Sequence, residues 1–202
     1  MQSRSVALRA GIRLEVISIG LATLETLFAL VIGAGSGSIA LVGFGLDSVI
    51  EIISSSALIW RFCNDDFAAR ERVETAALRI VGWCFLALAA YIVIESALTL
   101  AGGERPQRTL AGIVVLALSF VAMSILRGAK KKVGCELDSA SMHADARQTE
   151  FCAYLSLIAL AGVGLNEAVG WWWADPVAAL AMVPIIIREG LEAARGEACS
   201  HG

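Results

Sequence analysis

The sequence predicts an all-α polytopic membrane protein, a six-transmembrane-helix bundle with both termini in the cytoplasm. Three observations lead to this fold class: 57% of the 202 residues are hydrophobic, only 17% are charged, and the mean hydropathy is +0.73. Soluble domains are typically about 45–50% apolar and about 25% charged. One span takes about 20 helical residues, so the chain has room for several spans joined by short connections.

The first three apolar stretches occupy residues 14–33, 38–60 and 78–101. The first follows a cytoplasmic N-terminal segment at 1–13, and no small-residue cleavage site follows it, so we expect a retained helix rather than a signal peptide. The glycine-rich run at 33–38 is short enough to be a tight turn between antiparallel helices. A charged connection at 61–79 separates the second helix from the third.

The last three apolar stretches occupy residues 109–126, 151–166 and 172–188, and a polar turn near residue 141 begins the fifth. The third and fourth are separated by a Gly-Gly pair and Pro106, and the fourth and fifth by a basic connection at 127–138. Asp175 and Pro176 open the sixth, as is common at a helix start. The transmembrane domain is therefore placed at 14–188, followed by a short cytoplasmic tail at 189–202.

Basic residues indicate the orientation, because short cytoplasmic loops are enriched in Lys and Arg. Fourteen of the 16 Lys and Arg fall on one side of the predicted helices, including the run Lys130–Lys132, and Arg105 and Arg108 fall on the other. Residues 171–173 are all Trp, which suits the outer interfacial belt. The five cysteines show no paired spacing, so reduced thiols are expected. We expect a multi-pass protein of the inner (cytoplasmic) membrane that binds no nucleic acid.

The sharpest chemical signal is a pair of acids in the second apolar stretch, Asp47 and Glu51. Residues four apart lie about 40° apart around a helix and one turn along it, so both carboxylates point the same way. Two such charges repel at membrane depth unless they share a proton or bind a cation. No Lys or Arg lies within the apolar stretches, which disfavours a purely structural ion pair. Metal or proton handling is predicted.

The segment from Gly37 to Trp60, with the strings SIAL at 38–41 and LDSVIE at 46–51, resembles the second helix of the cation diffusion facilitators, a family of divalent-metal efflux transporters. In that family an Asp or His in this helix, followed four residues later by an acid, forms half of a tetrahedral site. An Ala-Asp-Ala segment of the fifth helix leads to a His and an Asp that complete it. Here 144–146 is Ala-Asp-Ala, and Gln148 and Cys152 stand at the two ligand positions.

The resemblance thus implies a metal site of Asp47, Glu51, Gln148 and Cys152. It also implies a homodimer that exports a divalent cation in exchange for protons, so that the metal is a transported substrate and not a permanent cofactor. No nucleophile or cofactor motif accompanies the acids, and no enzyme activity is expected. Only 14 residues follow Arg188, where many members carry a soluble domain, so a membrane-domain-only version is expected.

Helical geometry puts Asp145, Gln148 and Cys152 on one stripe of the fifth helix. A thiolate favours Zn²⁺ or Cd²⁺ over harder ions, whereas an amide is a poor zinc ligand. Two alternatives stay open: Cys152 is a ligand or a small buried filler, and Gln148 contacts the metal or bonds another helix.

Four further residues are candidates for the ion pathway or a proton relay, because ionisable groups at membrane depth are costly: Asp145, Glu25, Glu95 and His143. Two other functions also fit the sequence. The chain could be a membrane metal-binding accessory protein that does not transport, or a proton-coupled carrier of another cation.

Overall fold

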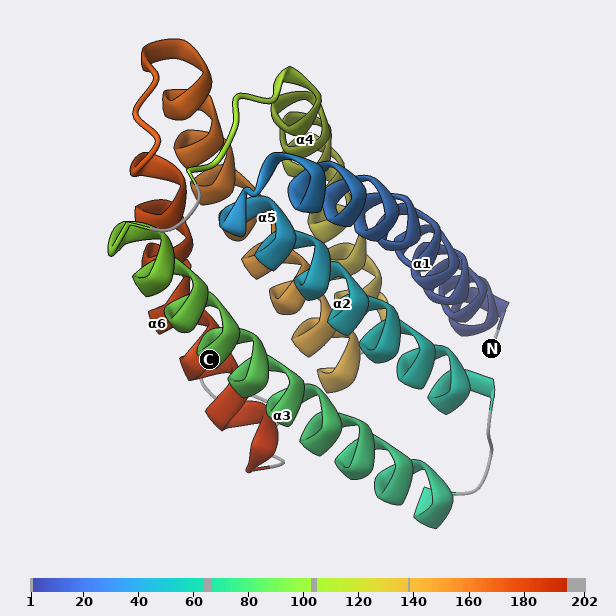
Figure 1. Cartoon of the computed structure of the whole chain (residues 1–202). Helices are drawn as coiled ribbons and strands as arrows, with labels where there is room; N and C mark the ends of the chain where they lie inside the picture. The colour runs from blue at the N-terminus through green and yellow to red at the C-terminus, as the bar shows by residue number, and fades with distance from the viewer. Residues whose placement is uncertain (1, 64–66, 103–104, 138, 196–202) are drawn as a thin grey trace.

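The computed structural model describes residues 2–63, 67–102, 105–137 and 139–195, and its regular elements there are all α-helices (Figure 1). Six helices follow one another along the chain: α1 (Gln2–Ser36), α2 (Ile39–Cys63), α3 (Phe67–Leu100), α4 (Leu110–Leu137), α5 (Ala140–Val169) and α6 (Ala174–Ala194). The all-α fold class is confirmed.

In the described part of the chain, five helices are long and apolar enough to cross a membrane: Val6–Ser36, Ile39–Cys63, Thr75–Leu100, Leu110–Leu137 and Met142–Val169. These establish a polytopic membrane protein. α6 is shorter, with 21 residues, and is not among the five, because Asp175 lies in its first turn and charged residues follow its apolar middle. A sixth crossing, which would return the chain to its starting side, stays a prediction.

The helices are longer than the apolar stretches that predict them. α1 begins at Gln2, α3 begins at Phe67, and α4 continues to Leu137 through the basic run. The added segments are rich in Ala, Arg, Glu and Lys, which are good helix formers but lower the local hydropathy. Most of the connections expected at 61–79 and 127–138 are therefore helical. The glycine turn is found as expected, with Gly37 at φ +67°.

Four helices form one bundle in which α1 packs against α2 and α4, while α5 packs against α4 and α2. The other two, α3 and α6, pack mainly against each other (Figure 1). This α3–α6 pair joins the bundle through α2 and α5. The arrangement places α2 and α5 between the bundle interior and the α3–α6 pair.

Glycine permits the closest approach within the α3–α6 pair. A Cβ atom on Gly82 would lie 2.4 Å from the backbone nitrogen of Ala194 and 2.7 Å from the carbonyl oxygen of Gly190. Small residues that let backbones approach are a common way to hold helices together in membranes. Gly162 plays the same part between α5 and α6, where an added Cβ would lie 2.5 Å from that of Ala178.

Asp175 ties α6 to the start of α2. Its carboxylate accepts hydrogen bonds from the Ser38 hydroxyl and from the backbone N–H groups of Ile39, at 2.9 Å, and Ala40. Asp175 lies in the first turn of α6, as the sequence suggests, and its side chain caps the neighbouring helix α2. At the same end of the molecule Trp171 stacks on Trp173, with ring centroids 5.2 Å apart.

Candidate cation site

α1 brings two acids into the bundle by a stripe of small and polar residues. Its buried positions recur every three or four residues, the spacing of one helix face, and are Gly11, Glu15, Ser18, Ala22, Glu25 and Ala29. The opposite face carries exposed aliphatic and aromatic side chains such as Leu27 and Phe28. In a membrane protein such a distribution turns the apolar face toward lipid and the polar stripe toward other helices.

Three of the four predicted metal ligands line one small cavity between α2, α3, α5 and α6. Asp47 comes from α2, and Gln148 and Cys152 come from α5. The cavity has a volume of about 10 Å³, close to the minimum for one water molecule. The remaining lining residues are Phe85, Phe151, Leu155, Ile185, Ile186 and Glu189. We call this space the Asp47 cavity.

The cavity contains an acceptor with no partner. Asp47 and Cys152 are each 2% exposed, and the Asp47 oxygen Oδ2 has no hydrogen-bond partner. The Cys152 thiol and the Asp47 carboxylate line the same small cavity. Since buried polar groups are normally paired, an unpaired carboxylate oxygen beside an ion-sized space is a candidate cation ligand.

The four predicted ligands do not form a complete group in this conformation. The Gln148 side-chain oxygen accepts a hydrogen bond of 2.8 Å from Ser54, so the helix-to-helix bond is the alternative that is observed. Glu51 is 1% exposed, with both oxygens unpaired, and does not line the Asp47 cavity. Across the described ranges, no three His, Cys, Asp or Glu side chains are grouped closely enough to hold a metal ion.

A buried lysine lies between α1, α4 and α5. Lys130 of α4 is 0% exposed, and its Nζ lies 2.6 Å from Asp145 Oδ2 of α5 and 3.4 Å from Glu15 Oε2 of α1. The predictions that Lys130 belongs to a connection and that no basic residue lies inside the bundle are both wrong. α4 continues past residue 126 and turns Lys130 inward, while Lys131 and Lys132 stay exposed.

Glu15, Lys130 and Asp145 form what we call the ion-pair layer. Asp145 precedes Cys152 by seven residues on α5, which is about 10 Å along a helix axis, toward the predicted cytoplasmic end. The layer therefore lies between the depth of the Asp47 cavity and that end of the bundle. Its three charged side chains are all buried.

The other predicted pathway residues separate into two groups. Glu25 is buried in the bundle and accepts a hydrogen bond of 3.3 Å from Ser48 of α2. Glu95 is half-buried on α3, the helix that packs mainly against α6. His143 packs its ring against Gly134, where an added Cβ would lie 3.2 Å from it. Glu25 thus lies beside the acids of α2, whereas Glu95 and His143 do not.

Sequence reasoning misses Glu15 and Glu189. Glu15 follows the basic N-terminal segment closely and resembles a residue at the membrane boundary, but the three-to-four spacing of Gly11, Glu15, Ser18 and Ala22 is a signal that could have found it. Glu189 falls just beyond the end of the last apolar stretch. Its position on the wall of the Asp47 cavity depends on how the α3–α6 pair packs, and no local sequence pattern predicts that packing.

Comparison with known proteins adds two findings. Residues 70–198 match the family described as the cation efflux transmembrane domain, a range that contains most of α3 and all of α4, α5 and α6. The chain is also 26% identical over 174 residues to the magnetosome protein MamB of Paramagnetospirillum magneticum (strain ATCC 700264 / AMB-1), with 83% of this chain and 58% of that protein covered. The chain thus spans a little over half the length of this relative. Asp47 and Glu51 precede the range of the family match.

Proposed function

Since the chain belongs to the family of cation efflux transmembrane domains, we propose that it exports a divalent metal cation of the Zn²⁺ or Cd²⁺ class in exchange for protons. The observation that carries this proposal is the Asp47 cavity, where a carboxylate, a thiol and an amide meet at an ion-sized space. A thiolate and a carboxylate together favour Zn²⁺ and Cd²⁺ over Mg²⁺.

We propose that this conformation exists before a metal ion is bound by all of its ligands. Glu51 lies one turn from Asp47 on α2 and has no hydrogen-bond partner, so it is free to become a further ligand if α2 turns slightly relative to α5. Binding of the metal would release protons from the ligands, because a thiol and a carboxyl group coordinate only when deprotonated. This exchange supplies the coupling between metal and protons.

Alternating access then needs a closed side and an element that moves. The ion-pair layer is the proposed closure on the cytoplasmic side, and its ion pairs must separate for a cation to pass between α1, α4 and α5. The α3–α6 pair is the proposed moving element, because it contributes Phe85, Ile186 and Glu189 to the wall of the Asp47 cavity. A shift of this pair against α2 and α5 would open the cavity to the other side.

The test is metal-dependent proton movement in proteoliposomes that contain the purified protein and a pH-sensitive dye. We expect Zn²⁺ or Cd²⁺ to drive proton movement in the wild type and Asp47→Asn to abolish it. Glu150→Gln is the matched control, because Glu150 lies on α5 but pairs with Arg127 near the surface, 2.9 Å away. Wild-type flux in the Asp47→Asn protein would rule out the proposed site.

We further propose a homodimer in the cytoplasmic membrane, as the family resemblance implies. Light scattering of the purified protein in detergent, corrected for bound detergent, gives the mass of the protein component. A mass of one chain would contradict the dimer.

A proton-coupled carrier of another cation is the second candidate. It is favoured by the hydrogen bond that engages Gln148 and by the incomplete ligand group among the described residues. Such a carrier would show substrate-driven proton movement without added metal, and Cys152→Ser would leave this activity unchanged. An accessory protein that only binds metal would give no proton movement under either condition.

A further inference from the structure

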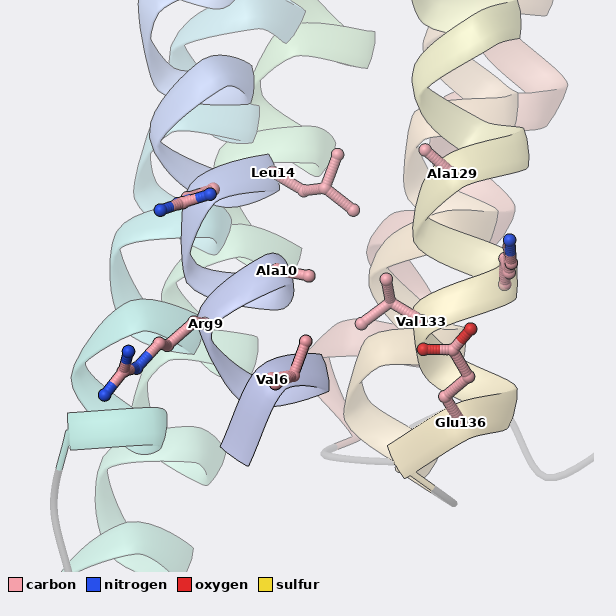
Figure 2. A pocket seen from close by; sticks show the side chains of 9 residues that line it. Val6, Arg9, Ala10, Leu14, Ala129, Val133 and Glu136 are labelled. Carbon is pink, nitrogen blue, oxygen red and sulfur yellow. The ribbon is translucent and has the colours of Figure 1, made fainter. Parts of the chain in front are cut away.

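A groove opens between α1 and α4 at the end predicted to face the cytoplasm. Its volume is about 560 Å³, within the range of about 300–1,000 Å³ typical of small-molecule sites. Figure 2 shows Ala10 and Leu14 of α1 facing Ala129 and Val133 of α4 across it, with Val6 at its end. The facing surfaces are thus apolar.

Basic side chains border this groove. Arg9, Arg13 and Lys132 line it and are exposed, while Glu136 is its one acid. Arg9 and Arg13 are one helical turn apart on α1, and Arg9 projects from the side of α1 away from α4 (Figure 2). Within the described residues, none of these three cations forms an ion pair. The groove therefore combines an apolar floor with three positive charges against one negative charge.

This combination suits an amphiphile whose head carries negative charge. The groove lies where the apolar span of α1 begins, at Val6, and so at the predicted boundary between headgroups and hydrocarbon. The cytoplasmic leaflet is the one that presents anionic lipids, and basic pockets between helices on that side bind their headgroups. A soluble anion would use the charges but not the apolar floor.

We propose that this groove binds one anionic phospholipid of the cytoplasmic leaflet. An acyl chain lies between Ala10, Leu14 and Val133, and the phosphate is held by Arg13 and Lys132, and by Arg9 once this exposed side chain turns toward α4. The bound lipid would bridge α1 and α4, two of the helices that the ion-pair layer also joins. Arg13 is two residues from Glu15 on α1, and Lys132 is two residues from Lys130 on α4. This proposal is independent of which ion the protein carries.

The test is native mass spectrometry of the purified protein with added dioleoyl phosphatidylglycerol or dioleoyl phosphatidylcholine. We expect one phosphatidylglycerol to stay bound to the wild type and phosphatidylcholine to be lost. Removing all three charges, by Arg9→Gln, Arg13→Gln and Lys132→Gln together, should weaken phosphatidylglycerol binding roughly 100-fold, because each basic residue near the surface is worth about fivefold.

Two further variants complete the design. The control removes three exposed basic residues on the same predicted side but outside the groove, by Arg72→Gln, Arg79→Gln and Lys131→Gln, and should keep the lipid. Ala10→Phe fills the groove without changing charge and should release the lipid. If this variant does not fold, the two charge variants still decide the question.

Three results would overturn the proposal: equal retention of both lipids, equal loss in both charge variants, or a bound lipid that survives removal of the three groove charges. The Ala10→Phe protein could also change from a dimer to a monomer while the two lipids bind equally. This result would overturn the proposal too, because it would identify the groove as a contact between copies of the chain.

Discussion

Replacing Lys130 with methionine should destabilise the protein strongly, because it leaves two buried acids without their cation. The ammonium lies 2.6 Å from Asp145 and 3.4 Å from Glu15, and all three side chains are buried. Methionine fills much of the space that the lysine stem occupies, so the change mainly removes the charge.

The size of the effect follows from these distances. At an effective dielectric constant of about 20, unit charges 2.6 Å and 3.4 Å apart attract each other by about 6 and about 5 kcal/mol. Burying three charged groups costs several kcal/mol for each of them, which offsets most of this attraction. Removing the lysine alone abolishes the attraction and leaves the acids buried. The free energy of unfolding should fall by about 3–5 kcal/mol.

The assay is reversible unfolding of the protein in mixed micelles, followed by tryptophan fluorescence. Lys132→Met is the matched control, because Lys132 lies two residues away and is exposed. The triple change Lys130→Met, Glu15→Gln and Asp145→Asn should recover most of the lost stability, since it leaves no unpaired charge buried. A loss in Lys130→Met no larger than that in Lys132→Met would refute the reasoning.

Three further predictions follow from the packing and the site. Gly82→Ala should lower the free energy of unfolding by about 1–3 kcal/mol, because its Cβ would meet backbone atoms that cannot move aside. Gly164→Ala is the control: a Cβ there would have nothing within 4 Å, so this variant should show no loss of stability in the same unfolding assay. Asp175→Ala should cost about 1–2 kcal/mol by removing the cap of α2, and thermal unfolding that matches the wild type would contradict the cap. Cys152→Ser should lower the affinity for Cd²⁺ relative to Mn²⁺ by on the order of tenfold, because a soft ligand is lost. Calorimetric competition with Gln148→Ala alongside would detect this change, and an unaltered preference would identify Cys152 as a filler.

The sequence predicts well the features that repeat along a helix. Six apolar stretches give six helices, and the glycine turn joins α1 to α2 as expected. The stripe of Asp145, Gln148 and Cys152 faces the interior, because a 3.6-residue period fixes which side chains share a face. Asp47 and Cys152 line the same cavity, and their role as metal ligands stays a prediction.

The features that depend on contacts between distant segments could not be predicted in the same way. Lys130 is buried because Glu15 and Asp145 neutralise it, and those partners lie more than 100 residues and 15 residues away in the sequence. A hydropathy pattern predicts the end of a membrane span at a basic run, whether or not an acid on another helix pairs with one of the basic residues. The separation of Glu51 from the Asp47 cavity, and the presence of Glu189 there, likewise depend on the packing of α2, α5 and the α3–α6 pair.

The position of a bound ion tests the central claim most directly. Crystals of the protein grown with Cd²⁺ and measured with anomalous scattering would locate the metal without reference to activity. We predict one strong peak in the Asp47 cavity, within bonding distance of the carboxylate of Asp47 and the sulfur of Cys152. A peak at the ion-pair layer with the Asp47 cavity empty would contradict this account.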